Sequence, residues 1–414
     1  MNRDELKDEQ EYLSARAGQR EWQLAKRMGI SRRRLLQLMV AGGALATFGG
    51  NRPERSFAQT APPAPTPVLK PTPPELFYDF GGNKEMRWEN MYGRGYVVPN
   101  ELFFVRNHTR TPRIEVANWR LKIEGSGIEL PLEMNYDQLL GLPSVSVLRY
   151  VECAGNGRSF FDTKEGKKAQ GTQWKWGAIG VAEWTGVPLR EVLERAGLKK
   201  SAVDVMPEGL DDLKVRRPMS IGKALEEDTL LVYAMNGQPL PADHGFPARI
   251  LTPGWIGIAN IKWLGRIEVS DKPLFSNWNT DTYVMIGPDF QAKPPAKGPI
   301  LSTQVVKSAV ELPWGGEIPG GDRLVRGRAW SPFGRIIRVE FSVDGGSWQN
   351  ARLREPNIAK AWVRWDVAWQ ARPGKYQIRA RATDEKGNTQ PDRVGYNEQG
   401  YLYNGIVEHP VTVK

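Results

Sequence analysis

Short apolar runs and strict apolar–polar alternation cover most of the chain, and this pattern predicts mainly β-strands. Runs at Val145–Val151 and Ala248–Leu251 indicate buried strands, because each is short and rich in β-branched or aliphatic residues. A helix is expected at Pro188–Ala196, where apolar residues recur at i, i+3 and i+4. A second short helix is expected at Met219–Leu225.

The pattern changes after a Pro-rich stretch at Gln291–Pro299, which predicts a domain boundary. In Arg338–Val343 apolar and polar residues alternate, as in a strand with one buried face. Turn residues such as Asp344-Gly345-Gly346 separate the runs, and together they predict a small β-sandwich of immunoglobulin type. Its expected strands are Leu324–Ala329, Ile336–Val343, Ala361–Ala368 and Tyr376–Thr383.

The first sixty residues resemble an export signal. Three arginines at Arg32–Arg34 precede an apolar run at Leu35–Phe48, which is shorter than the about 20 residues that a membrane span needs. Ser56-Phe57-Ala58 then offers small residues for a signal peptidase. This order is similar to a twin-arginine signal, so we expect export of the folded chain to the periplasm. The acidic stretch Met1–Gly29 is unusual for such signals, and an uncleaved anchor or an amphipathic surface helix are the alternatives.

Composition and charge narrow the function classes. The 414 residues are 40% hydrophobic and 25% charged, which is ordinary for a globular protein of two or three domains. The net charge is +10, but residues 1–58 hold 11 basic and 7 acidic residues, which leaves +6 on the remainder. That excess is too small to indicate a nucleic-acid partner, and it suits an anionic substrate.

Cysteine and histidine are scarce, and this limits the cofactors. A single Cys excludes an internal disulfide, a C-x-x-C-H haem site, a four-Cys iron–sulfur cluster and a Cys-rich zinc site. His108, His244 and His409 lie too far apart in sequence for an H-E-x-x-H zinc helix. Any redox cofactor must therefore use at most one thiolate. The twin-arginine route often carries proteins with a cofactor already bound, so a cofactor is expected.

The one cysteine lies where chemistry is often found. A strand-like run ends at Cys153, and the Gly-rich turn Ala154–Arg158 follows it. Glycines allow close approach of a bulky ligand, and Arg158 would favour the thiolate form. The alternative is a buried cysteine that acts as a small apolar side chain. The local residues alone leave both interpretations open.

The motif Cys153-Ala-Gly-Asn156, followed by Arg158, resembles the sulfite oxidase family of molybdopterin enzymes. Further segments resemble the family in the same order: Phe103–His108, Trp174–Ile179, Asn236–Gly237, Asp243–Arg249, Pro253–Trp255 and Ile261–Leu264. The resemblance covers about Leu76 to the C-terminus. It implies an α+β, mostly β fold. The expected divisions are a twin-arginine signal at 1–58, a Pro-rich tether at 59–75, a molybdopterin-binding catalytic domain at 76–295 and an immunoglobulin-like dimerisation domain at 296–414.

The resemblance also implies a role for each motif residue and one molybdenum–molybdopterin per chain. Cys153 would be the protein ligand of the metal. The residues expected to contact the pterin are His108, His244, Arg249 and Lys262. Arg106 and Arg158 would hold a small sulfur oxyanion, Trp174 would form a wall, and Tyr283 would bond the reacting oxygen.

Two positions depart from the family pattern. Thr282 stands where the family commonly has Asp, just before the active-site Tyr. Gln399 stands where family sulfite oxidases bring a further Arg from near the C-terminus. Loss of that cation weakens a sulfite pocket and could suit a larger or less charged sulfur compound. The two departures therefore concern the substrate and not the cofactor.

The implied reaction is oxidation of sulfite to sulfate by oxygen-atom transfer. No haem site is expected on this chain, so electrons would pass to a separate c-type cytochrome, and a homodimer is expected. The alternatives are a sulfane dehydrogenase-like subunit of a thiosulfate-oxidising system, another molybdopterin sulfur-compound oxidoreductase, or a methionine sulfoxide reductase. A non-catalytic immunoglobulin-like binding protein is the remaining class, and molybdenum content separates it from the others.

Overall fold

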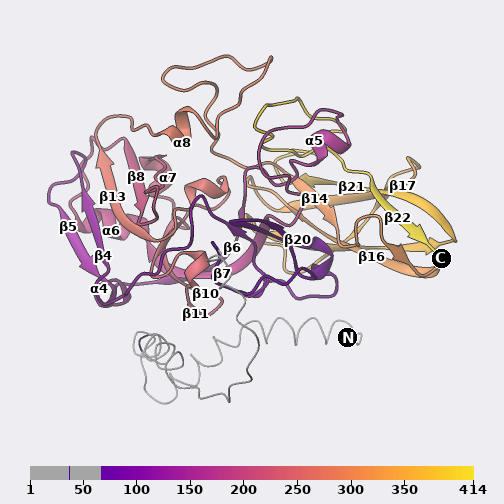
Figure 1. Ribbon diagram of the computed structural model, residues 1–414, viewed down its shortest axis with the longest axis horizontal. Helices are drawn as coiled ribbons and strands as arrows, with labels where there is room; N and C mark the ends of the chain where they lie inside the picture. Colours follow the sequence, from indigo (N-terminus) through magenta and orange to yellow (C-terminus); the bar gives the residue numbers. More distant parts are fainter. Residues whose placement is uncertain (1–36, 38–66) are drawn as a thin grey trace, which may run out of the picture.

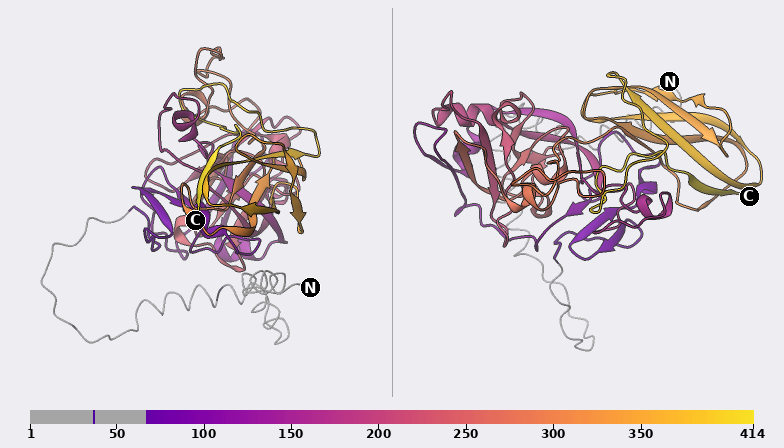
Figure 2. Two further views of the ribbon diagram at one scale, coloured as in Figure 1. Left: turned by 90° about the vertical axis from the view of Figure 1, so that its right-hand side faces the viewer. Right: turned by 90° about the horizontal axis from the view of Figure 1, so that it is seen from above.

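The computed structural model describes residue 37 and residues 67–414. There the chain forms a first lobe (residues 67–303) and a C-terminal lobe (residues 304–414), which lie end to end (Figures 1 and 2). The predicted signal, apart from Gln37, and the first part of the predicted tether lie outside the described residues. No helix in the described ranges is both long and apolar enough to cross a membrane.

The sheet that carries Cys153 is built around β7. Its strands are β6 (Val145–Glu152), β7 (Ile179–Pro188), β10 (Leu230–Met235), β11 (Gln238–Pro239) and β12 (Arg249–Leu251). The order is β11-β10-β7-β6, with β12 paired to β10. β6 and β12 confirm the two strands expected in this lobe. Because β6 ends at Glu152, it delivers Cys153 to the edge of the sheet.

Two further sheets complete the first lobe. One has the order β5-β4-β13-β8-β9, and its β4 and β13 are parallel. The other is the small sheet β1-β2-β3 near the start of the described chain. Their strands are β1 (Phe77–Phe80), β2 (Asn83–Met86), β3 (Val105–Arg106), β4 (Arg120–Glu124), β5 (Leu132–Asn135), β8 (Asp204–Gly209), β9 (Met219–Ser220) and β13 (Leu264–Ser270).

The helices are short. They are α4 (Tyr136–Leu140), α5 (Phe160–Thr163), α6 (Leu189–Arg195), α7 (Ile221–Ala224) and α8 (Asn277–Thr280), with 3-10 turns at Trp88–Met91, Ala242–His244 and Gly257–Ala259. α6 confirms the helix expected at Pro188–Ala196. The helix expected at Met219–Leu225 is wrong at its start, because Met219 and Ser220 pair with β8 as strand β9. The Ser220 side chain accepts from Lys223 N and caps α7, so the helix begins at Ile221.

The C-terminal lobe is the expected β-sandwich. Its strands are β14 (Lys307–Val310), β15 (Glu317–Ile318), β16 (Gly321–Trp330), β17 (Ile336–Val343), β18 (Gln349–Asn350), β19 (Arg352–Arg354), β20 (Trp362–Ala371), β21 (Gly374–Asp384) and β22 (His409–Val413). The two sheets have the orders β14-β16-β20-β19 and β15-β22-β21-β17-β18. All four predicted strands are confirmed, and the fold is mostly β, as expected. The side chains of Val339, Phe341, Val363 and Ile378 are fully buried between the sheets.

The lobes share a core. Trp176 and Cys153 of the first lobe belong to the same buried cluster as Trp330, Trp362 and Tyr403 of the C-terminal lobe. In Figure 1 the long strands β6, β7 and β20 lie side by side near the junction, and Tyr150 N donates to Lys360 O.

The end of the predicted tether is part of the folded lobe. Leu69 N donates to Asp243 Oδ1 (3.0 Å), Lys70 N donates to Asp243 Oδ2 (2.7 Å), and Val68 is buried. The folded region therefore begins before Leu76, because backbone amides in this Pro-rich run find a buried carboxylate as partner.

Candidate active site

Cys153 lies at the wall of a cavity, held by the turn that follows β6. Its N donates to Ala178 O (2.9 Å) and its O accepts from Asn156 N (3.0 Å). Glycine is required at position 155, because a Cβ there would lie 2.4 Å from the Arg158 guanidinium. The turn thus packs Arg158 against the backbone beside Cys153.

One cavity brings together residues from distant parts of the sequence. All five residues predicted to bind the cofactor line it, and so do two of the four predicted catalytic residues. These seven are Arg106, His108, Cys153, His244, Arg249, Lys262 and Tyr283. The structure thus places them on one surface, while their individual roles stay predictions.

One end of the cavity is lined by buried cations. Arg249 donates to the carbonyls of His244 (3.0 Å) and Asn260 (3.1 Å), and Lys262 Nζ donates to Asp243 O (2.8 Å) and to the Asn107 side chain. Burial lowers the pKa of Arg249 to about 9. Burial, with Arg249 adding to it, holds the pKa of Lys262 well below its usual range. An anionic ligand would raise the pKa of both side chains again, because its negative charge favours their protonated forms.

His244 adds an unused hydrogen-bonding atom to the same region. The side chain is 2% exposed, and its Nε2 is buried without a partner. Burial, with Lys70 adding to it, holds the pKa of His244 well below its usual range, so the ring is neutral. Unpaired buried polar atoms are rare in folded proteins and suggest a missing ligand.

These observations fit a phosphate-bearing pterin with many donors and acceptors. Among the residues that the structure describes, no three His, Cys, Asp or Glu side chains gather around a possible metal position. A metal at Cys153 would therefore need most of its ligands from a cofactor. A molybdopterin would meet that need, because it would supply sulfur ligands of its own and Cys153 would supply the protein thiolate.

A second group of contacts fixes His108 and Tyr283. The Arg106 guanidinium can only donate, so at 3.2 Å it makes His108 Nδ1 an acceptor. His108 Nε2 then carries the proton and donates to the Tyr283 hydroxyl (3.1 Å). Burial, with Arg106 and Lys262 adding to it, lowers the pKa of His108 to about 2. The Tyr283 hydroxyl hydrogen is thereby free to donate to another group.

Arg158 lies behind this group rather than on the cavity surface. Its Nε donates to Gln399 O and its Nη1 to Thr172 O, both at 2.8 Å. The guanidinium lies 5.3 Å from the Tyr401 ring, which stacks on Tyr283 at 5.1 Å with an interplanar angle of 13°. Arg158 therefore reaches the site through Tyr401.

Trp174 also lies outside the cavity wall. It is fully buried and meets the cavity-lining Phe104 edge-on at 6.5 Å, so Phe104 separates it from the space. The expected wall role for Trp174 is thus taken by Phe104.

The two departures from the family pattern lie beside the same group. Gln399 donates to Asp281 O (3.1 Å), and its Oε1 is buried without a partner. Thr282 donates to Asn277 O (3.2 Å). Residues near the C-terminus therefore return to the site.

Sequence reasoning did not find Tyr401 or Trp278. The Trp278 ring packs 4.2 Å from His108, and Tyr401 stacks on Tyr283. The only local signal for Tyr401 is its place two residues after Gln399.

Two parts of the chain match known domain families. Residues 108–278 match the oxidoreductase molybdopterin binding domain, and residues 304–413 match the Mo-co oxidoreductase dimerisation domain. The chain is 36% identical to sulfite oxidase of Gallus gallus over 329 residues, which cover 74% of this chain and 71% of that protein.

The chain belongs to the sulfite oxidase family. The mitochondrial sulfite oxidase of Mus musculus is 37% identical over 331 residues, and the chain spans about 60% of the length of that relative. Among solved structures, the sulfane dehydrogenase SoxCD from Paracoccus pantotrophus matches with a TM-score of 0.70 and 27% identity. That match covers 85% of this chain and 92% of the other. As a member of the sulfite oxidase family, the chain combines a molybdopterin-binding domain with a dimerisation domain.

Proposed function

We propose that this chain is a molybdenum-dependent sulfite dehydrogenase of the periplasm. In the overall reaction sulfite gains one oxygen from water and releases two electrons and two protons. The observation that carries the proposal is one cavity that holds a lone thiol, the Arg106 guanidinium and the Tyr283 hydroxyl. A bound molybdenum cofactor would supply the two-electron oxygen-atom transfer.

The chain's own residues bind and orient the substrate. Arg106 offers a donor fork for an oxyanion, and Arg158 adds positive charge behind Tyr401. His108 stays neutral and holds Tyr283, so the phenol hydrogen can donate to an oxygen in the cavity. These groups are fixed before substrate arrives, which favours transition-state stabilisation.

The location, the electron acceptor and the assembly are parts of the same proposal. The twin-arginine-like segment supports export to the periplasm, and a chain with no haem motif would pass its electrons to a separate c-type cytochrome. The match of residues 304–413 to a dimerisation domain supports a homodimer.

A second function is a sulfane dehydrogenase subunit that oxidises a bound sulfane sulfur. Gln399 favours it, because this position offers an amide where a sulfite pocket would gain a third cation. The likeness to the SoxCD structure also supports it.

The test is sulfite-dependent reduction of cytochrome c by the exported, molybdenum-loaded protein. Cys153→Ser should abolish turnover and lower molybdenum content, because it removes the predicted metal ligand. Activity in the wild type that Cys153→Ser retains in full would refute the ligand assignment. If the loaded wild type oxidises a protein-bound persulfide but not sulfite, the second function replaces the first.

A further inference from the structure

A buried carboxylate lies directly behind the predicted metal ligand. Glu152 precedes Cys153 in the chain and is fully buried. Its Oε1 accepts from Lys307 Nζ (2.8 Å) and from Asn156 Nδ2 (2.9 Å). Its Oε2 accepts from Trp330 Nε1 (3.0 Å). Both oxygens of this carboxylate therefore have partners.

Three of the donors around Glu152 come from the C-terminal lobe. Lys307 belongs to β14 and Trp330 to β16, and Gln304 Nε2 donates to the backbone O of Glu152 (2.9 Å). Lys307 Nζ also donates to Asn156 O (3.1 Å), and its side chain is fully buried. The C-terminal lobe thus bonds both ends of the turn that contains Cys153.

Asn156 connects this network to the thiol-bearing residue. Its N donates to Cys153 O (3.0 Å), and its Oδ1 accepts from Ala178 N (3.1 Å). Cys153 N in turn donates to Ala178 O (2.9 Å). A shift of Glu152 or Asn156 would therefore move Cys153.

A buried ion pair seldom adds net stability, because removing two charges from water costs about as much as their attraction returns. An apolar pair of similar size would fill the same space between the lobes. Lys307 instead bonds the Glu152 side chain and the Asn156 carbonyl, and so fixes the orientation of the chain where β6 ends. This indicates that the ion pair positions Cys153 rather than stabilises the fold.

We propose that Glu152, Lys307 and Trp330 are positioning residues for Cys153. Through them the C-terminal lobe holds the thiol where it faces the cavity, so this lobe is part of the metal site as well as a match to a dimerisation domain. The expected effect on turnover rests on the proposed function. The expected effect on the thiol does not.

The protein offers a direct readout, because Cys153 is its only cysteine and is 5% exposed. A thiol reagent therefore reports on one atom. In the full-length protein prepared without cofactor, Lys307→Met should raise the alkylation rate of Cys153 by at least about 10-fold. Trp330→Phe keeps an aromatic ring but removes the indole donor and part of the buried ring volume, and it leaves the Lys307 bonds in place, so its increase should be smaller.

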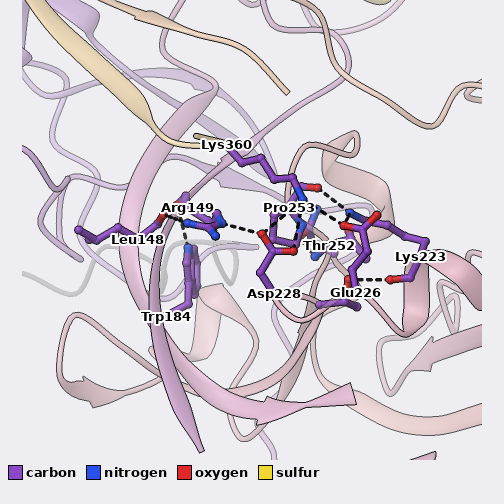
Figure 3. A network of polar contacts seen from close by, with 11 residues as sticks. Leu148, Arg149, Trp184, Lys223, Glu226, Asp228, Thr252, Pro253 and Lys360 are labelled. Carbon is purple, nitrogen blue, oxygen red and sulfur yellow. Dashed lines mark hydrogen bonds and ion pairs between the residues drawn. The ribbon is translucent and has the colours of Figure 1, made fainter. Parts of the chain in front are cut away.

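The matched control is Lys360→Met, which removes another cation that joins the lobes. Lys360 Nζ lies 3.0 Å from Glu226 Oε2 and 3.4 Å from Asp228, in the network of Figure 3. These acids come from the loop after α7 and not from the Cys153 turn. Lys360→Met should therefore keep the wild-type alkylation rate even where it lowers Tm.

The molybdenum-loaded variants give the second readout. Lys307→Met should lower kcat on the order of 100-fold and leave KM near the wild-type value, since a shift of about 1 Å at a reacting group costs that much and the substrate arginines stay in place. Molybdenum per chain should fall as well.

Equal alkylation rates in Lys307→Met and Lys360→Met would overturn the proposal. If Lys307→Met does not fold, Trp330→Phe provides the test. An alkylation rate of Cys153 in Trp330→Phe equal to the wild-type rate would then overturn the proposal. If the loaded wild type oxidises no sulfur compound while Lys307→Met still exposes the thiol, the proposed function fails and the positioning role stands.

Discussion

At the residue scale, the buried cations of the site donate their hydrogen bonds to carbonyl oxygens and not to carboxylates. The hydrogen-bond acceptors described for the Arg158 and Arg249 side chains are all backbone oxygens. A carboxylate would neutralise these charges, whereas a carbonyl fixes their geometry and leaves the charge for an anion. The positive charge of these side chains therefore stays available for the anions of the proposed function.

Individual residues of the site differ in whether the sequence could predict them. The five residues predicted to bind the cofactor lie in short motifs that resemble the sulfite oxidase family, and all of them line the cavity, while their roles stay predictions. Tyr401 and Lys307 were not found as parts of the site, because their partners Tyr283 and Glu152 lie more than a hundred residues away. Such pairings arise only when the lobes pack, and no local pattern encodes them.

The third histidine has a structural role that pH can test. His409 is buried, its Nε2 donates to Pro313 O (3.1 Å), and burial lowers its pKa to about 4. A lowered histidine pKa stabilises the fold above the unfolded value of about 6.5, and that contribution is lost as pH falls. Between pH 6.5 and 4 the protein should lose about 3 kcal/mol through His409 alone.

His409→Gln is the variant that measures this loss. Gln keeps a donor for Pro313 and cannot titrate, so the dependence of Tm on pH should flatten between pH 6.5 and 4. His409 lies outside the cavity, so turnover at pH 7 should not change. Parallel Tm profiles of wild type and variant across this range would show that folding does not lower the pKa of His409.

At the element scale, β7 is the longest strand of the first lobe, and the sequence did not predict it. β7 is buried along almost its whole length, because β6 and β10 flank it and other residues cover both sides. It therefore shows no alternation of apolar and polar positions. The strands of the sandwich have one face toward solvent, and their alternation was visible.

The turn after β6 is the element that sets the position of Arg158. In Gly155→Ala the new Cβ would lie 2.4 Å from the Arg158 guanidinium, which two carbonyls hold in place. The guanidinium must move, and KM for sulfite should rise by roughly 10-fold, which corresponds to about 1.4 kcal/mol of lost electrostatic attraction from behind Tyr401. Steady-state kinetics on the loaded enzyme measures this.

Gly222→Ala is the control for that substitution. Gly222 lies in α7, where a Cβ would meet no atom within 4 Å, so KM should stay at the wild-type value, and Tm should rise slightly because Ala favours a helix over Gly. An unchanged KM in both variants would mean that Arg158 does not contribute to substrate binding.

At the scale of the whole molecule, the lobes depend on each other unequally. The sandwich has an apolar cluster of its own, whose members all lie between Val306 and Val411. The cluster around Cys153 instead includes Trp330, Trp362 and Tyr403 from the C-terminal lobe. The first lobe also has a cluster that lies almost wholly within it, so the cluster around Cys153 is the part of its core that is incomplete without the C-terminal lobe.

Truncation tests this asymmetry. A chain that ends at Thr303 loses those three aromatic side chains, each worth roughly 3–5 kcal/mol when buried, out of a total stability of about 5–15 kcal/mol. It should show no cooperative unfolding in urea by circular dichroism. Residues 304–414 alone should unfold in one sharp transition. A sharp transition in the truncated first lobe, with Cys153 still protected from alkylation, would show that the shared cluster is dispensable and that the lobes are independent units.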